Sequence, residues 1–153
     1  MPDHHLAQLN VGRIVQPLDH PAIDEFRLAL DPINALAEAT PGFVWRLTDE
    51  DGASSSYVDG GTDDPLVLVN LSVWEDWDSL KHFLYRSGHV AYLRRRREWF
   101  EASEQATAVC WWLPAGTVPT VAEAWERLDR LRADGPTDDA WPLTQPRPAP
   151  APS

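Results

Sequence analysis

The order of strand and helix patterns in this sequence predicts an α+β fold with one antiparallel sheet. Four segments alternate apolar and polar residues or form short apolar runs, as strands do, and longer segments repeat apolar residues at helical spacing. They follow one another as strand, helix, strand, strand, helix, strand, with a further helix at the end. This is the order of the split βαβ, or ferredoxin-like, sheet with an extra C-terminal helix.

The first strand is predicted in HLAQLNVGRI, residues 5–14, and its two faces differ in character. Gln8 and Asn10 fall on one face, whereas the other face is apolar. A helix follows over residues 21–41, with apolar residues at helical spacing. Pro32 lies inside this helix and is expected to kink it or to split it in two.

Two strands are predicted on either side of a long polar connection. The first is FVWRL at residues 43–47, and the second is LVLVNLSVW at residues 66–74. In the second, Asn70 and Ser72 share a face opposite a row of apolar residues. The connection, residues 48–65, is rich in Asp, Gly and Ser, which is typical of a mobile loop.

The second half of the chain predicts further helices and a fourth strand. A short helix over residues 77–85 is followed by a bend at 87–88 and a longer helix to about residue 101. The strand is TAVCWWLPAG at 107–116, which ends at proline and glycine. Thr120, with a glutamate three residues later, is a capping box for the last helix.

The chain is predicted to form one domain, residues 1–136, followed by a proline-rich flexible tail, residues 137–153. Helices on one face of the sheet would leave the other face uncovered. The polar strand positions suggest which face that is, so two sheets would close into a dimeric α/β barrel with these side chains pointing inward. We therefore expect a homodimer.

Composition excludes several classes of partner. The chain has 24 acidic and 13 basic residues and a formal net charge of -11, which is opposite to the charge that nucleic acid requires. No apolar run is long enough to cross a membrane, and the first residues lack the pattern of a signal peptide. With a single cysteine and no metal site indicated, a cytoplasmic protein without membrane or nucleic-acid partners is predicted.

Several consecutive segments resemble a known bacterial family, the domain-of-unknown-function family 3291. These segments are HLAQLNVGR, LDPINALAEATPGFVWRL, LVNLSVWEDWDSL, YRSGHVAYLRRRREWF, WWLPAG and PTVAEAWERLDRL. The resemblance covers residues 6–134. It implies membership of the dimeric α/β barrel group, which includes antibiotic-biosynthesis monooxygenases and heme-degrading monooxygenases.

The heme-degrading relatives use an asparagine on the first strand, together with a tryptophan and a histidine ten residues apart on a later helix. Asn10 matches the first of these. The residue ten positions before His89 is Ser79, so the aromatic partner is missing. The resemblance therefore does not carry heme degradation to this chain.

The four consecutive arginines at residues 94–97 are predicted to lie on different faces of a helix. On an unbroken helix, His89 and Arg96 lie on the apolar stripe with Tyr92 beside them. In a structural role, Arg96 would pair with Glu25 or Asp31, and His89 would bond a backbone carbonyl. In a functional role, His89 would be a general base, an acid or a metal or heme ligand, and Arg96 would bind an anionic group.

The predicted function is that of a small-molecule enzyme, a cyclase, an isomerase or a cofactor-independent oxygenase. Asn10 and Asn70 would orient a carbonyl or enolate oxygen of a hydrophobic aromatic or polyketide-like substrate, and His89 would move a proton. The predicted substrate-binding residues are Gln8, Ser72, Arg96, Trp45, Trp111 and Tyr92, of which the two tryptophans could equally be core. The alternatives are a heme enzyme with His89 as axial ligand, or a non-catalytic dimeric binding protein.

Overall fold

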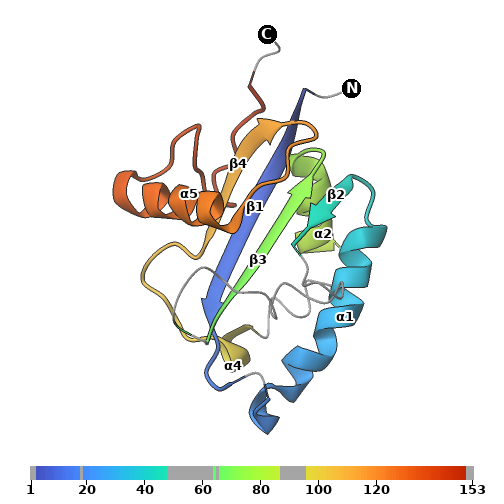
Figure 1. Ribbon diagram of the computed structural model, residues 1–153, viewed down its shortest axis with the longest axis vertical. Coiled ribbons are helices and arrows are strands. Elements are labelled where there is room, and N and C mark those ends of the chain that lie inside the picture. The colour runs from blue at the N-terminus through green and yellow to red at the C-terminus, as the bar shows by residue number, and fades with distance from the viewer. Residues whose placement is uncertain (1–2, 18, 48–63, 65, 87–95, 151–153) are drawn as a thin grey trace.

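The computed structural model describes residues 3–17, 19–47, 64, 66–86 and 96–150. One antiparallel sheet has the strand order β2-β3-β1-β4, with helices on both sides (Figure 1). The strands are β1 (His4–Arg13), β2 (Phe43–Arg46), β3 (Val67–Trp74) and β4 (Ala108–Pro114). The helices are η1 (Pro21–Ile23), α1 (Asp24–Ala39), α2 (Trp77–Arg86), α4 (Arg96–Trp99) and α5 (Val121–Asp134). The predicted split βαβ fold with an extra C-terminal helix is confirmed.

Of the two effects expected of Pro32, a kink or a split, the split is wrong, because helix α1 continues through Pro32. A proline inside a helix removes one backbone hydrogen bond to the residue four positions earlier. That residue is Leu28, which is exposed, so water can solvate its free carbonyl. At α5 the predicted cap is confirmed, because the hydroxyl of Thr120 accepts a hydrogen bond from the backbone N–H of Glu123 at 3.1 Å.

The predicted long helix to about residue 101 is corrected at its end. Helix α4 stops at Trp99, and Phe100 instead forms an antiparallel bridge with Ile14. The residues predicted to begin that helix, 87–95, lie outside the described residues.

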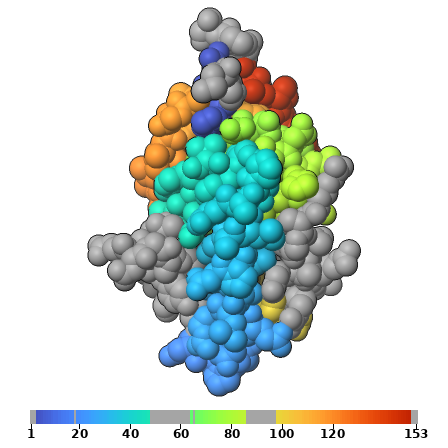
Figure 2. All heavy atoms as spheres, turned by 90° about the vertical axis from the view of Figure 1, so that its right-hand side faces the viewer, coloured from blue at the N-terminus to red at the C-terminus, as the bar shows by residue number. Residues whose placement is uncertain are grey.

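The two faces of the sheet carry different layers. Helices α1 and α2 cover the face of β1 and β3 that holds the polar side chains, and Figure 2 looks directly onto α1 with α2 beside it. Helix α5 packs on the opposite, purely apolar face, where Ala124, Leu128 and Leu131 are buried. The prediction that the polar face is uncovered and points into a barrel is therefore wrong.

The apolar face is buried within the single chain. Leu9, Leu71 and Val73 each expose 1% or less of their surface. The reason given for a barrel dimer, an uncovered polar face, therefore does not hold, and the homodimer itself stays a prediction. No helix within the described residues is both long and apolar enough to cross a membrane.

Residues 137–147 pack on the folded domain, which corrects the predicted flexible tail over this range. Trp141 is fully buried and exchanges two backbone hydrogen bonds with Cys110 at the outer edge of β4, at 2.7 and 3.0 Å. Its indole packs edge-on against Trp77 of α2. Further along, the Arg147 carbonyl accepts a hydrogen bond from Trp112 Nε1 at 2.9 Å. The buried indole of Trp141 thus anchors a segment whose polar, proline-rich composition predicts that it does not pack.

Candidate functional site

Four predicted polar residues meet on the helix-covered face of the sheet. Gln8 lies opposite Ser72 in the pairing of β1 with β3, and Asn10 lies opposite Asn70. Gln8 Nε2 donates hydrogen bonds to Asn70 Oδ1 and to Ser72 Oγ, both at 2.7 Å. Gln8 and Ser72 are buried, whereas Asn70 is the exposed member of the group. The sequence-predicted amides are thus brought together by strand register, as alternation requires.

Counting donors and acceptors shows what this cluster still offers. Ser72 Oγ also accepts a hydrogen bond from Trp74 Nε1 at 2.9 Å, so both of its lone pairs are occupied and its own hydrogen is left to donate. Asn70 Oδ1 accepts from Gln8 Nε2 with one lone pair, which leaves its second lone pair and the two N–H groups of Asn70 Nδ2. Ser72 and Asn70 therefore offer three hydrogen-bond donors, the Ser72 O–H and the two Asn70 N–H groups, against one remaining acceptor lone pair on Asn70.

The polar cluster forms part of the wall of a cavity of about 170 Å³ between the sheet and α1 and α2. The apolar wall of the cavity comes from α1, from α2 and from the sheet. This wall is aromatic near both ends of β1 and β3. Around the start of β3 these rings are Phe26, Trp99 and Phe100, and around its end they are Phe43, Trp74 and Phe83. The cavity thus combines flat apolar surfaces with a few convergent polar groups, as small-molecule sites do.

Asn34 is a cavity residue that the sequence analysis missed. It lies on α1, exposes only 9% of its surface and lines the cavity from the helix side. Its Nδ2 is buried and has no hydrogen-bond partner. A signal was present, because Asn34 is one turn after Leu30 on the apolar stripe that includes Ile33 and Ala37.

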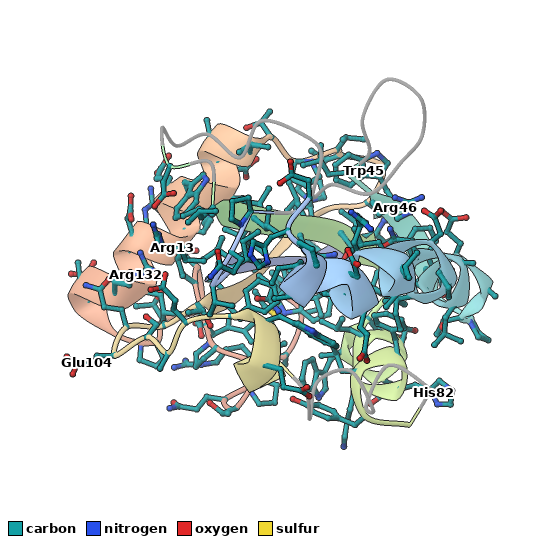
Figure 3. The ribbon with its side chains drawn as sticks, turned by 90° about the horizontal axis from the view of Figure 1, so that it is seen from below. Arg13, Trp45, Arg46, His82, Glu104 and Arg132 are labelled. Carbon is teal, nitrogen blue, oxygen red and sulfur yellow. The ribbon has the colours of Figure 1, made fainter. Side chains whose placement is uncertain are left out.

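Arg46 is a second missed residue and brings a positive charge to the cavity wall. It lies at the end of β2, opposite Ser72 in the register, and its guanidinium is close to α1 (Figure 3). There its Nε bonds to Glu38 Oε1 at 2.7 Å, and the side chain is only 16% exposed. Sequence spacing gave no hint of this role, because β2 is too short to show a clear alternation.

The two predicted tryptophans do not line the cavity. Trp111 is fully buried on the α5 side of the sheet, where the guanidinium of Arg127 lies over its ring at 5.9 Å from the centroid. Trp45 packs against the same apolar cluster. Trp111 is therefore part of the core, whereas Trp45 is half-buried and packs against it.

The predicted proton donor or acceptor, His89, and its neighbour Tyr92 lie outside the described residues. So does the side chain of Arg96, although its backbone begins α4. Their roles stay predictions. His82 projects outward from α2, as expected for a surface histidine (Figure 3).

The described residues give little support to thiol, metal or heme chemistry. Burial raises the pKa of the Cys110 thiol far above its ordinary value, which keeps it protonated and unreactive. Among the described residues, no three His, Cys, Asp or Glu side chains gather into a metal-binding group. The described lining of the cavity includes no histidine, cysteine, methionine or tyrosine, and His89, the predicted axial heme ligand, lies outside the described residues, so the heme alternative stays a prediction.

The fold and the cavity define a single split βαβ domain with an internal space between its sheet and two helices. The chain belongs to the family described as Domain of unknown function (DUF3291), whose model matches residues 5–153, and the predicted family is confirmed. A comparison with curated proteins finds no match.

Solved structures similar to this chain share a low sequence identity with it. PA3566 from Pseudomonas aeruginosa has 11% identity and a TM-score of 0.47, with 74% of this chain and 95% of that chain covered. SnoaB, a cofactor-independent oxygenase from Streptomyces nogalater, has 17% identity and a TM-score of 0.45, with 74% and 95% covered. Rv0793 from Mycobacterium tuberculosis has 15% identity and a TM-score of 0.46, with 76% and 99% covered.

Proposed function

We propose that the protein binds a small hydroxyaromatic or enolisable carbonyl compound in the cavity and holds it as its oxyanion. The observation that carries this proposal is the donor surplus of Ser72 and Asn70. Together they have three N–H or O–H groups left over, against one remaining lone pair on Asn70 Oδ1. A ligand that complements such a wall must supply an electron-rich oxygen.

Donors that face a ligand oxygen favour its charged form. A hydrogen bond to a charged group contributes about 1.5 to 3 kcal/mol, which corresponds to about one to two pKa units for the ligand. The guanidinium of Arg46 on the same wall acts in the same direction, with part of its charge offset by the ion pair to Glu38. The cavity should therefore lower the pKa of a bound phenol or enol.

Such an anion is the reactive form in several reactions that need no cofactor. An enolate or phenolate carbon attacks an electrophile in cyclisation, is reprotonated elsewhere in isomerisation, and reacts with molecular oxygen in cofactor-independent oxygenation. We propose that the protein is an enzyme of one of these three classes, with Asn70 and Ser72 holding the oxygen. His89 remains the sequence-predicted group for the proton transfer.

The size of the cavity narrows the predicted substrate. A volume of about 170 Å³ is below the roughly 300 to 1,000 Å³ of pockets that hold drug-sized ligands. A molecule with one ring matches this space better than the polyketide-like compounds suggested by sequence.

The test is the pKa of a bound chromogenic phenol. 4-Nitrophenol is titrated with excess protein, and the absorbance of its phenolate is followed against pH. We expect its pKa to fall by about one unit or more on binding and to rise again in Asn70→Ala, which removes two donors. Ser103→Ala, an exposed change at a residue that does not line the cavity, serves as the control. Absence of binding, or preferential binding of the neutral phenol, would overturn the proposal.

A further inference from the structure

The cavity has a second polar position on the side opposite the sheet. Asn34 lines it from α1, whereas Gln8, Asn70 and Ser72 line it from the strands. The amide nitrogen of Asn34 is buried and has no acceptor, and the neighbours of Asn34 on the same helix face are apolar. The two polar positions therefore lie on opposite walls of one cavity.

An unsatisfied buried amide is unfavourable for the folded protein. Position 34 lies on the stripe of α1 where Leu30, Ile33 and Ala37 pack inward, and a leucine there would also favour the helix. The amide is thus the one polar group on this stripe, and packing gives no reason for it. A ligand oxygen in the cavity would supply the missing acceptor.

We infer that Asn34 is a specificity-determining residue that donates a hydrogen bond to a second oxygen of the ligand. This inference rests on the proposed function and names its substrate class. The ligand is a flat ring with two acceptor oxygens at opposite ends, as in a hydroxyaryl aldehyde or ketone. One oxygen meets the donors of Asn70 and Ser72 on the sheet, and the other meets Asn34 on the helix.

The experiment compares two ligands that differ only in the second oxygen. 4-Hydroxybenzaldehyde has it, and 4-vinylphenol has nearly the same planar shape without it. Their Kd values are measured by calorimetry for the wild-type protein and for Asn34→Leu, which keeps the branched shape, is somewhat larger and removes the amide. We expect Asn34→Leu to lose about tenfold in affinity for the aldehyde and to keep its affinity for 4-vinylphenol, because only the aldehyde has an acceptor for the amide.

Stability gives a second measurement that does not depend on binding. The melting temperature of ligand-free Asn34→Leu should rise, because the variant removes a buried donor without a partner. Ala35→Leu and Ala35→Asn, on the exposed side of the same turn, differ by the helix propensity of leucine over asparagine, and this difference is subtracted. An unchanged or lower melting temperature after this subtraction would mean that bound water or a protein group satisfies the amide, and would overturn the inference.

The failures of the two proposals can be told apart. If neither ligand binds the wild-type protein, the proposed function fails. If both bind, and Asn34→Leu weakens both equally or neither, the oxyanion proposal stands and the role of Asn34 is overturned.

Discussion

Replacing Ser72 by alanine should destabilise the protein through the donors that its hydroxyl satisfies. Ser72 Oγ accepts hydrogen bonds from Gln8 Nε2 at 2.7 Å and from Trp74 Nε1 at 2.9 Å, and all three residues are buried. In Ser72→Ala, Gln8 Nε2 keeps its bond to Asn70, but Trp74 Nε1 loses its acceptor. A buried donor without a partner costs about 1 to 3 kcal/mol, so we expect a loss of about 2 kcal/mol in the free energy of unfolding.

Urea unfolding followed by circular dichroism measures this loss. Ser103→Ala is the matched control, because that hydroxyl is exposed and bonds only to the nearby Gln105 backbone, so its change should stay within about 0.5 kcal/mol. A change of similar size in Ser72→Ala would refute the reasoning, since it would mean that water replaces the hydroxyl without cost.

A double-mutant cycle assigns the loss to the indole. Trp74→Phe removes the N–H but keeps a ring between Phe43 and Phe83. In Ser72→Ala/Trp74→Phe no indole donor is left without an acceptor, so the double variant should be about 1 kcal/mol more stable than the sum of the two single changes implies. If the two single changes are additive, the loss of stability in Ser72→Ala does not come from the hydrogen bond between the hydroxyl and the indole.

Three further predictions follow from packing and charge. Trp141→Ala should lower the free energy of unfolding by about 3 to 5 kcal/mol, measured by urea unfolding, and a loss below about 1 kcal/mol would contradict its place in the core. Gly12→Ala should cost about 1 to 3 kcal/mol in the same assay, because the added methyl overlaps the ring of Phe100, and an unchanged midpoint would argue against this contact. A hydrogen bond from Arg13 lowers the pKa of Asp64. The stability that this pair contributes is therefore present above the ordinary carboxyl range and is lost as pH falls through the folded-state pKa of Asp64. Arg13→Gln should raise that pKa in an NMR titration, and no rise would count against the pair.

The pairing of the polar strand residues was predictable, but the layer that covers them was not. A period of two places Gln8 with Asn10, and Asn70 with Ser72, on single strand faces, and the structure joins the two faces through register. Periodicity does not state which face the helices cover. The face that the helices cover depends on the connections between elements. The expectation that a polar face lies away from the helices fails where the polar side chains line a cavity between sheet and helices.

The missed and corrected positions share one cause, which is that their environment is set by residues distant in the chain. Asn34 lies on the apolar stripe of α1, but the stripe alone does not show that Asn34 lines a cavity. Trp111 could not be given a face until β4 was paired with β1. Trp141 stands alone among prolines, and its pocket is made by Cys110 and Trp77, 31 and 64 residues earlier.

The bridge between Trp141 and Cys110 also bears on how the domain folds. The apolar cluster on the helix-covered side includes both Leu6 and Trp141, which are 135 positions apart in the sequence. A contact between such distant segments costs chain entropy before its burial is gained, so the cluster cannot form until both segments are present and have come together. A chain shortened to residues 1–136 lacks Trp141 and should therefore be more sensitive to proteases than a chain that includes it.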